Sequence, residues 1–209
     1  MINLPSEKPA YHDSYLTVSG ISEGVYKDRG SKFHYFCYPV SSEEEIKTVL
    51  GSLRKTFFDA SHHCFAWVLG KEGLTFRAND DGEPNHSAGD PILGQIRSHQ
   101  LTNVLIVVVR YFGGTKLGVS GLIQAYKTSA AMAIEENEIV EEWVMVKLAL
   151  QFPYPAMNAV MKVVKSQNLV IIAQEMNLDC NITLSVRQGL AEQVLEKLGE
   201  IEAVSIRID

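Results

Sequence analysis

Residues 104–121 read Val104-Leu105-Ile106-Val107-Val108-Val109-Arg110-Tyr111-Phe112-Gly113-Gly114-Thr115-Lys116-Leu117-Gly118-Val119-Ser120-Gly121. The first six residues are continuously apolar rather than alternating, which is typical of a strand covered on both faces. Residues 120–135 then place apolar side chains at helical spacing, with Leu122 and Tyr126 on the inward side. The stretch therefore predicts a buried strand, a glycine-rich loop over 110–119 and a helix over 120–135.

Two interpretations fit the glycine-rich loop. Glycines let backbone N–H groups converge, and a helix start adds partial positive charge, so the loop could hold an anion or a phosphate together with Arg110 and Lys116. The glycines can equally serve only to let the helix pack closely on the sheet. The spacing matches neither G-x-G-x-x-G nor G-x-x-x-x-G-K-[ST], so neither of those phosphate-binding mechanisms applies. On the first interpretation, the anion-binding or nucleic-acid-binding residues are Arg77, Arg110, Tyr111, Phe112, Gly113, Gly114, Lys116, Gly118, Ser120, Gly121 and Lys127.

Upstream of this stretch, the pattern alternates strands and helices. The predicted elements are a strand over 32–40, a helix over 43–56 and a hairpin of strands over 62–69 and 74–78. Ser42 and Glu45 form an S-x-x-E capping box at the start of the first helix. A polar loop follows over 79–89, and Asp90 is expected to cap a short helix with Pro91 in its first turn.

The polar loop contains a second motif, Asp80-Asp81-Gly82-Glu83. Its three carboxylates could bind a divalent metal or take part in acid–base chemistry. The same residue types are usual in a solvent-facing loop whose Asp side chains bond their own backbone. Because the acids do not alternate as in an EF-hand loop, no metal site is predicted.

Ser61-His62-His63-Cys64 forms a third motif. In a strand, His62 and Cys64 share one face and could form a nucleophile pair or half of a zinc site. A histidine in a half-buried strand can also be a packed, hydrogen-bonded residue. The sequence offers no second nearby thiol, G-x-S-x-G or H-E-x-x-H motif. We therefore predict no catalytic residue and no cofactor.

The last third of the chain has a different rhythm. We predict a strand over 144–150, a helix over 157–167, strands over 170–176 and 181–186, a helix over 190–198 and a strand over 203–208. This β-α-β-β-α-β order is the ferredoxin-like split unit. The predicted organisation is thus a lead-in over 1–13, an α/β domain over 14–140 and a ferredoxin-like domain over 141–209.

Composition and charge restrict the class of protein. The 209 residues are 46% hydrophobic and 21% charged, which excludes a disordered chain, a collagen-like fibre and a disulfide-stapled miniprotein. The net charge of −6 gives no overall basic field for bulk nucleic-acid binding. Cys37, Cys64 and Cys180 lie far apart, and neither a signal peptide nor a membrane-spanning apolar run is visible. We expect a cytoplasmic protein without membrane contact.

Several motifs together resemble a known family. They are Asp80-Asp81-Gly82-Glu83-Pro84, Ala88-Gly89 with Pro91-Ile92-Leu93, Asn103-Val104-Leu105, Arg110-Tyr111-Phe112-Gly113-Gly114 with Lys116-Leu117-Gly118, and Gly121-Leu122 with Ala125-Tyr126. In type and spacing they resemble the IMPACT family, called YigZ-like in bacteria, over roughly residues 15–209. The chain departs from the family at Asn85-His86-Ser87, where Ser-Gly-Thr is usual, and at Gln124, where an Arg is usual. The second departure removes a cation that could contact phosphate.

The resemblance implies a mixed α/β (α+β) fold. It implies an N-terminal domain of the ribosomal protein S5 domain 2 type, followed by a ferredoxin-like domain. Because the chain starts directly with the α/β part, it resembles the bacterial form, without the extra N-terminal domain of eukaryotic relatives. The implied function is a non-enzymatic regulator or binding protein of translation, with RNA or a ribosome-associated protein as partner. Two alternatives stay open: a small-molecule enzyme that binds phosphate or nucleotide at the Gly113–Gly121 loop, and a protein-interaction scaffold that uses Tyr111 and Phe112.

Overall fold

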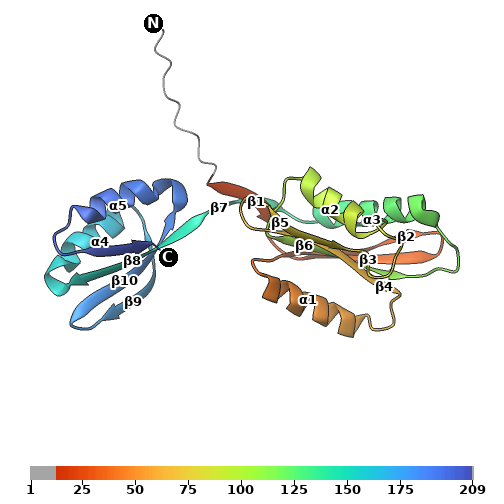
Figure 1. Ribbon diagram of the computed structural model, residues 1–209, viewed down its shortest axis with the longest axis horizontal. Coiled ribbons are helices and arrows are strands. Elements are labelled where there is room, and N and C mark those ends of the chain that lie inside the picture. The colour runs from red at the N-terminus through yellow and green to blue at the C-terminus, as the bar shows by residue number, and fades with distance from the viewer. Residues whose placement is uncertain (1–12, 209) are drawn as a thin grey trace, which may run out of the picture. The chain divides into compact units, whose positions relative to one another are not determined.

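The computed structural model describes residues 13–208, and the chain divides into two compact units (Figure 1). One unit runs from Tyr15 to Glu142. The other starts at Trp143 and takes in Asp13 and Ser14. Of the predicted lead-in, residues 1–12 lie outside the described residues, whereas Asp13 is buried and belongs to the second unit. Within residues 13–208, no helix has the length and apolarity to cross a membrane.

The first unit is built on a five-stranded sheet in which every neighbouring pair is antiparallel. Its strands, in spatial order, are β2 (Ser22–Asp28), β3 (Ser31–Pro39), β6 (Val104–Tyr111), β4 (His62–Leu69) and β5 (Thr75–Asn79). The continuous apolar run forms the central strand, β6, as predicted. Helix α1 (Glu43–Thr56) lies on one face of the sheet, and α2 (Gly89–Ser98) and α3 (Gly118–Glu135) lie on the other (Figure 1).

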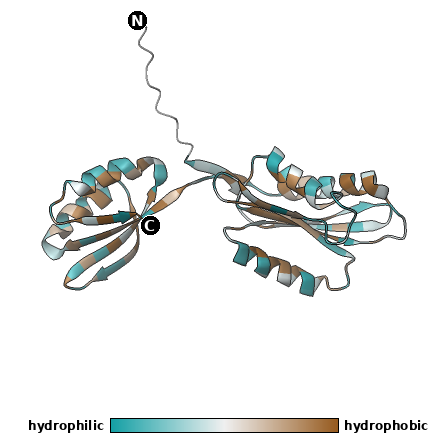
Figure 2. Ribbon diagram, in the orientation of Figure 1, coloured by the Kyte–Doolittle hydropathy of each residue, from teal (hydrophilic) through white to brown (hydrophobic). Residues whose placement is uncertain are grey.

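Strand β6 contributes to two hydrophobic cores because its side chains alternate between the two faces. Leu105, Val107 and Val109 pack in the cluster that includes Ile46 of α1. Val104, Ile106 and Val108 pack in the cluster that holds the buried residues of α2 and α3. Figure 2 shows the apolar strands between helices that carry both hydrophobic and hydrophilic residues, as expected for amphipathic covering helices.

The sequence predicts α1 and β4 with the observed bounds. Ser42 Oγ accepts from the Glu45 N–H at 3.3 Å, as in a capping box, but Glu45 accepts in return from the Ser41 N–H, at 2.7 Å. Three strands were not predicted: β2, and the pair β1 (Ser14–Val18) and β7 (Ile139–Trp143), which form a separate two-stranded sheet. The likeness of this unit to ribosomal protein S5 domain 2 stays a prediction.

The second unit has the predicted β-α-β-β-α-β order. Its elements are β8 (Met145–Pro153), α4 (Met157–Ser166), β9 (Val170–Met176), β10 (Asp179–Arg187), α5 (Ala191–Gly199) and β11 (Ser205–Ile208), with short 3-10 turns at Tyr154–Ala156 and Gln188–Leu190. The antiparallel sheet has the order β11-β8-β10-β9. Alternate residues of β8 and β10 form a core with α4 and α5 that is separate from the cores of the first unit.

Candidate anion-binding site

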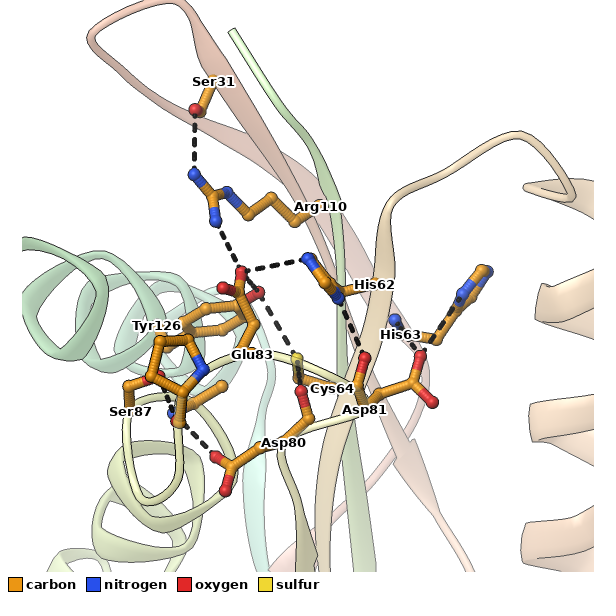
Figure 3. A network of polar contacts seen from close by, with 12 residues as sticks. Ser31, His62, His63, Cys64, Asp80, Asp81, Glu83, Ser87, Arg110 and Tyr126 are labelled. Atoms are coloured by element: carbon orange, nitrogen blue, oxygen red, sulfur yellow. Dashed lines mark hydrogen bonds and ion pairs between the residues drawn. The ribbon is translucent and has the colours of Figure 1, made fainter. Parts of the chain in front are cut away.

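Arg110, at the end of β6, is buried and ion-paired. Its Nη1 lies 2.6 Å from Glu83 Oε1, and the two side chains are only 7% and 4% exposed (Figure 3). Its Nη2 donates to Ser31 Oγ at 3.5 Å, and its Nε–H has no hydrogen-bond partner among residues 13–208. Arg110 is therefore not the open cation that the glycine-loop prediction assumed, because Glu83 balances its charge.

Glu83 also connects to the histidine–cysteine motif. Glu83 Oε1 accepts from the Tyr126 hydroxyl at 2.8 Å and lies 3.9 Å from His62 Nε2. Cys64 Sγ lies 3.3 Å from the Tyr126 hydroxyl and 3.0 Å from the Asp80 carbonyl, and its single S–H donates to one of these two oxygens at a time. Burial raises the pKa of the Cys64 thiol and of the Tyr126 phenol far above their usual values. Both groups keep their protons at neutral pH, so this geometry supports packed residues rather than a thiolate nucleophile.

Asp80 holds the start of helix α2. Its Oδ1 accepts from the Ala88 and Gly89 N–H groups at 2.9 and 2.8 Å, and its Oδ2 accepts from the His86 N–H at 2.9 Å. The prediction that Asp90 caps this helix is wrong, because the helix begins at Gly89 and Asp90 lies exposed in its first turn. The carboxylate that accepts the N–H groups at this helix start is that of Asp80, nine positions before Gly89 in the chain.

Asp81 ties the same loop to β4 and α1. Its Oδ2 accepts from the His63 N–H at 2.7 Å and its Oδ1 from Arg54 at 3.0 Å. Its carbonyl lies 2.8 Å from His62 Nδ1, and Gly82 follows with a φ of +89°. The Asp80–Glu83 motif thus joins several elements through occupied carboxylates. Within residues 13–208, no group of His, Cys, Asp and Glu side chains is arranged to hold a metal ion.

A cavity of about 300 Å³ lies beside Arg110, at the start of helix α3. We call it the Arg110 pocket. It is lined by Glu83, Pro84, Arg110, Phe112, Lys116, Leu117, Gly118, Val119 and Leu122. The N-cap residue of α3, Leu117, makes no side-chain capping bond, and the first turn contains no acid. The first N–H groups of a helix have no partner within the helix, so this end carries partial positive charge.

A second hollow of about 400 Å³, which we call the Lys32 hollow, lies next to the Arg110 pocket. It is lined by Gly30, Lys32, His34, Phe57, Asp59, Tyr111 and Phe112. Phe112 is 52% exposed and lines both hollows, with its ring centre 5.7 Å from the Arg110 guanidinium carbon. Tyr111 is less available than predicted, because its hydroxyl donates to Asp59 Oδ1 at 2.7 Å.

The structure brings together only part of the predicted anion-binding set. Phe112, Lys116 and Gly118 line the Arg110 pocket, whereas the Gly113 N–H donates to Ser31 Oγ at 3.2 Å. A side chain at Gly113 would overlap the backbone of Gly30, so this glycine serves close packing. Gly114 and Gly118 have φ values of +84° and +74°, which glycine adopts without strain. The remaining members, Ser120 and Gly121, lie in the first turn of α3 and do not line the pocket.

Two predicted cations lie elsewhere. Arg77 pairs with Trp67, whose side chain packs in the cluster on the α1 face. Arg110 instead pairs with Phe33, whose side chain packs in the cluster on the opposite face, with α2 and α3. Lys127 is exposed and follows Leu122 by five residues, which places it about 140° around helix α3 from Leu122. Leu122 lines the Arg110 pocket and Lys127 does not. Sequence reasoning in turn missed Ser31 and Lys32, because each reaches the site through the pairing of β3 with β6 rather than through a local motif.

Comparison with protein families places this site in a known context. The Impact N-terminal domain model matches residues 29–134, which include all residues lining the Arg110 pocket. IMPACT family member YvyE of Bacillus subtilis is 37% identical over 132 residues, which cover 63% of this chain and 61% of YvyE, so the match spans less than two thirds of that protein. IMPACT family member YigZ of Escherichia coli is 30% identical over 150 residues, which cover 71% of this chain and 74% of YigZ.

One solved structure agrees with the fold over nearly the whole chain. The crystal structure of a hypothetical protein matches with a TM-score of 0.74 and 25% identity, over 93% of this chain and 96% of that one. The two-domain translational regulator Yih1 aligns with a TM-score of 0.35 and 25% identity, over 65% of this chain and 51% of Yih1. By its family-model match and its bacterial relatives, the chain belongs to the IMPACT family.

Proposed function

We propose that this chain is a non-catalytic regulatory protein of translation that binds RNA at the surface around Phe112. The role in translation is proposed from membership of the IMPACT family. We propose that the chain is not catalytic because the polar groups beside the Arg110 pocket are engaged with one another or stay protonated. Glu83 is held by Arg110 and Tyr126, and the Cys64 thiol stays protonated.

The observation that carries the RNA proposal is the position of Phe112. Phe112 is half-exposed and lines two hollows, and each hollow has an exposed lysine in its lining, Lys116 in one and Lys32 in the other. Proteins that bind single-stranded nucleic acids combine aromatic rings, on which bases stack, with cations that follow the phosphates. The net charge of −6 does not oppose this proposal, because a local surface can be positive on an acidic protein.

Fluorescence anisotropy with a labelled single-stranded RNA and a labelled stem-loop tests the proposal. We expect binding that weakens between about 50 and about 200 mM salt. A plot of log affinity against log salt then has a negative slope, and the substitution Lys116→Gln should make this slope shallower by about 0.7 for the single strand, because one phosphate contact is lost. Phe112→Leu should weaken binding about tenfold, because one stacking contact is lost.

Phe76→Leu is the matched control for Phe112→Leu. Phe76 is 47% exposed and lies on β5, which is an edge strand of the same sheet and is separated from β6 by β4. It does not line either hollow, so this variant should bind RNA like the unchanged chain. Equal losses in the two variants, or binding without salt dependence, would contradict the proposed surface.

A further inference from the structure

We propose that the Arg110 pocket receives the terminal phosphate of a nucleotide chain, while the adjoining base stacks on Phe112. This inference rests on the proposed RNA-binding function and names the part of the RNA that enters the pocket. Three properties of the pocket lead to it: a buried donor, a helix start without a capping side chain, and a size that suits one end group.

The donor is the Nε–H of Arg110. The residue is 6% exposed, it lines the pocket, and this N–H has no partner among the residues that the structure describes. A buried donor without an acceptor is unfavourable, and an oxyanion is an acceptor of high strength for a guanidinium.

The helix start provides the second set of donors. Helix α3 has 18 residues, so its first turn carries the full partial charge of a helix end. Gly118 and Val119 of this turn line the pocket, and the N-cap residue, Leu117, makes no side-chain capping bond to them. Phosphate groups bind readily at such helix starts, because the N–H groups and the helix dipole both favour negative charge.

The charge balance of the pocket also favours an anion. Glu83 is the one carboxylate in its lining, and Arg110 balances it at 2.6 Å. The same Glu83 oxygen also accepts a hydrogen bond from the hydroxyl of Tyr126, which is fully buried and does not line the pocket. Lys116 and the α3 helix start therefore remain as the net positive contributions to the lining.

The size of the pocket distinguishes an end group from an internal phosphate. A volume of about 300 Å³ is at the lower limit for small-ligand pockets. Its walls include the apolar side chains of Leu117, Val119 and Leu122, which offer no hydrogen-bond donors to a second phosphate. An internal phosphodiester has nucleotides on both sides and needs an open groove, whereas a terminal phosphate enters with one nucleotide behind it.

The test compares one RNA sequence with different ends, using the full chain. Oligonucleotides with a 5′-phosphate, a 3′-phosphate or hydroxyl groups at both ends are measured by anisotropy, and adenosine monophosphate and adenosine serve as competitors. We expect one phosphorylated end to bind about tenfold more tightly than the hydroxyl-ended RNA, because an end phosphate adds charge-assisted hydrogen bonds. The monophosphate should compete, and adenosine should not.

Val119→Glu tests the location. Val119 is 53% exposed, and an acid in a first helical turn favours the helix, so the variant should fold while its carboxylate repels a phosphate in the pocket. The preference for the phosphorylated end should disappear, while hydroxyl-ended RNA still binds. Gln124→Glu adds the same charge to α3 at an exposed position outside the pocket and should keep the preference.

The outcomes separate this inference from the proposed function. Equal affinity for all ends would overturn the terminal-phosphate inference and leave RNA binding in place. A preference that survives in Val119→Glu would also overturn it, since the phosphate would then bind elsewhere. Failure of every RNA to bind would overturn both proposals.

Discussion

Glu83 and Arg110 turn two separate sequence motifs into one buried contact. The acidic loop supplies Glu83, the glycine-loop motif supplies Arg110, and 27 positions separate them in the chain. Removing one partner of a buried ion pair leaves the other charge buried without compensation, which costs more than the pair itself contributes. At the scale of the residue, the main role of Glu83 and Arg110 is therefore to keep each other's buried charge compensated in the folded protein.

Replacing Glu83 tests this interpretation. Glu83→Gln keeps the shape of the side chain but leaves the Arg110 charge unbalanced, so we expect a loss of about 3 kcal/mol in the free energy of unfolding. Arg54→Gln is the control, because Arg54 is 51% exposed in its ion pair with Asp81, and such surface pairs contribute less than about 1 kcal/mol. Urea unfolding measures both losses. Similar values for the two variants would show that burial of the Glu83–Arg110 pair does not matter.

Asp13 gives the second unit a dependence on acid. Its carboxylate accepts from Arg187 at 2.6 and 2.8 Å and from the Gly189 N–H at 2.9 Å, and the hydrogen bond from Arg187 is the main cause that lowers the pKa of Asp13 to about 2. The folded pKa lies below the unfolded value of about 3.9, so folding favours the ionised carboxylate. The resulting stabilisation is complete above about pH 4 and is lost as the pH falls towards about 2.

The substitution Asp13→Asn should remove this dependence. We expect the variant to have a lower melting temperature than the unchanged chain at pH 5, and the difference should shrink as the pH falls through the window between about 4 and about 2. Thermal unfolding followed by circular dichroism at several pH values measures it. A difference that stays constant across that window would contradict the role of the ionised carboxylate.

At the scale of the element, helix α2 shows how a distant residue can define a helix start. Asp80 accepts three backbone N–H groups near this start, whereas Asp90, the residue expected from the local sequence, contacts His86 at the surface. Asp80→Ala should lower the free energy of unfolding by about 2 kcal/mol, at the upper end of the effect of a lost helix cap. Asp90→Ala should cost less than about 1 kcal/mol, as for other surface pairs. Urea unfolding distinguishes the two, and a larger loss for Asp90→Ala would refute the assignment.

The elements that sequence analysis found are those with a local signal. Helix α1 has a capping residue and helical spacing, and β6 is continuously apolar. Strand β2 has neither signal, because it contains polar residues at the surface and Gly24 in its middle. Its pairing with β3 explains the glycine, since a side chain there would overlap the Tyr35 ring. Such a strand is specified by its neighbour in space, which one sequence does not display.

The same distinction applies to the candidate site. Phe112, Lys116 and Gly118 were predicted because they stand in one motif. Ser31 lies 79 positions from Arg110 and meets it only in the folded sheet. The neutralisation of Arg110 by Glu83 was missed for the same reason. Sequence analysis thus named part of the lining of the Arg110 pocket but assigned too much free positive charge to it.

At the scale of the whole molecule, the chain has separate hydrophobic cores in its two units. Ile106 is completely buried in a core of the first unit, and Leu150 is 2% exposed in the core of the second. The Phe112 surface and the match to the Impact N-terminal domain both lie within Tyr15–Glu142. A change in one core should therefore affect the stability of that unit, and a change in the second core should leave the proposed RNA-binding surface intact.

Matched core substitutions in the full chain test this separation. Ile106→Ala and Leu150→Ala each remove a buried aliphatic side chain, which costs about 2–5 kcal/mol, so each should lower the melting temperature of its own unit. Calorimetry should show two transitions, with Ile106→Ala shifting one and Leu150→Ala the other. At a temperature where both of its units stay folded, the Leu150→Ala variant should bind RNA with unchanged affinity. Adding Phe112→Leu to this variant should weaken RNA binding by the same factor as in the unchanged chain. If either substitution shifts both transitions equally, the two cores unfold as one cooperative system and the second unit contributes to the stability of the binding surface.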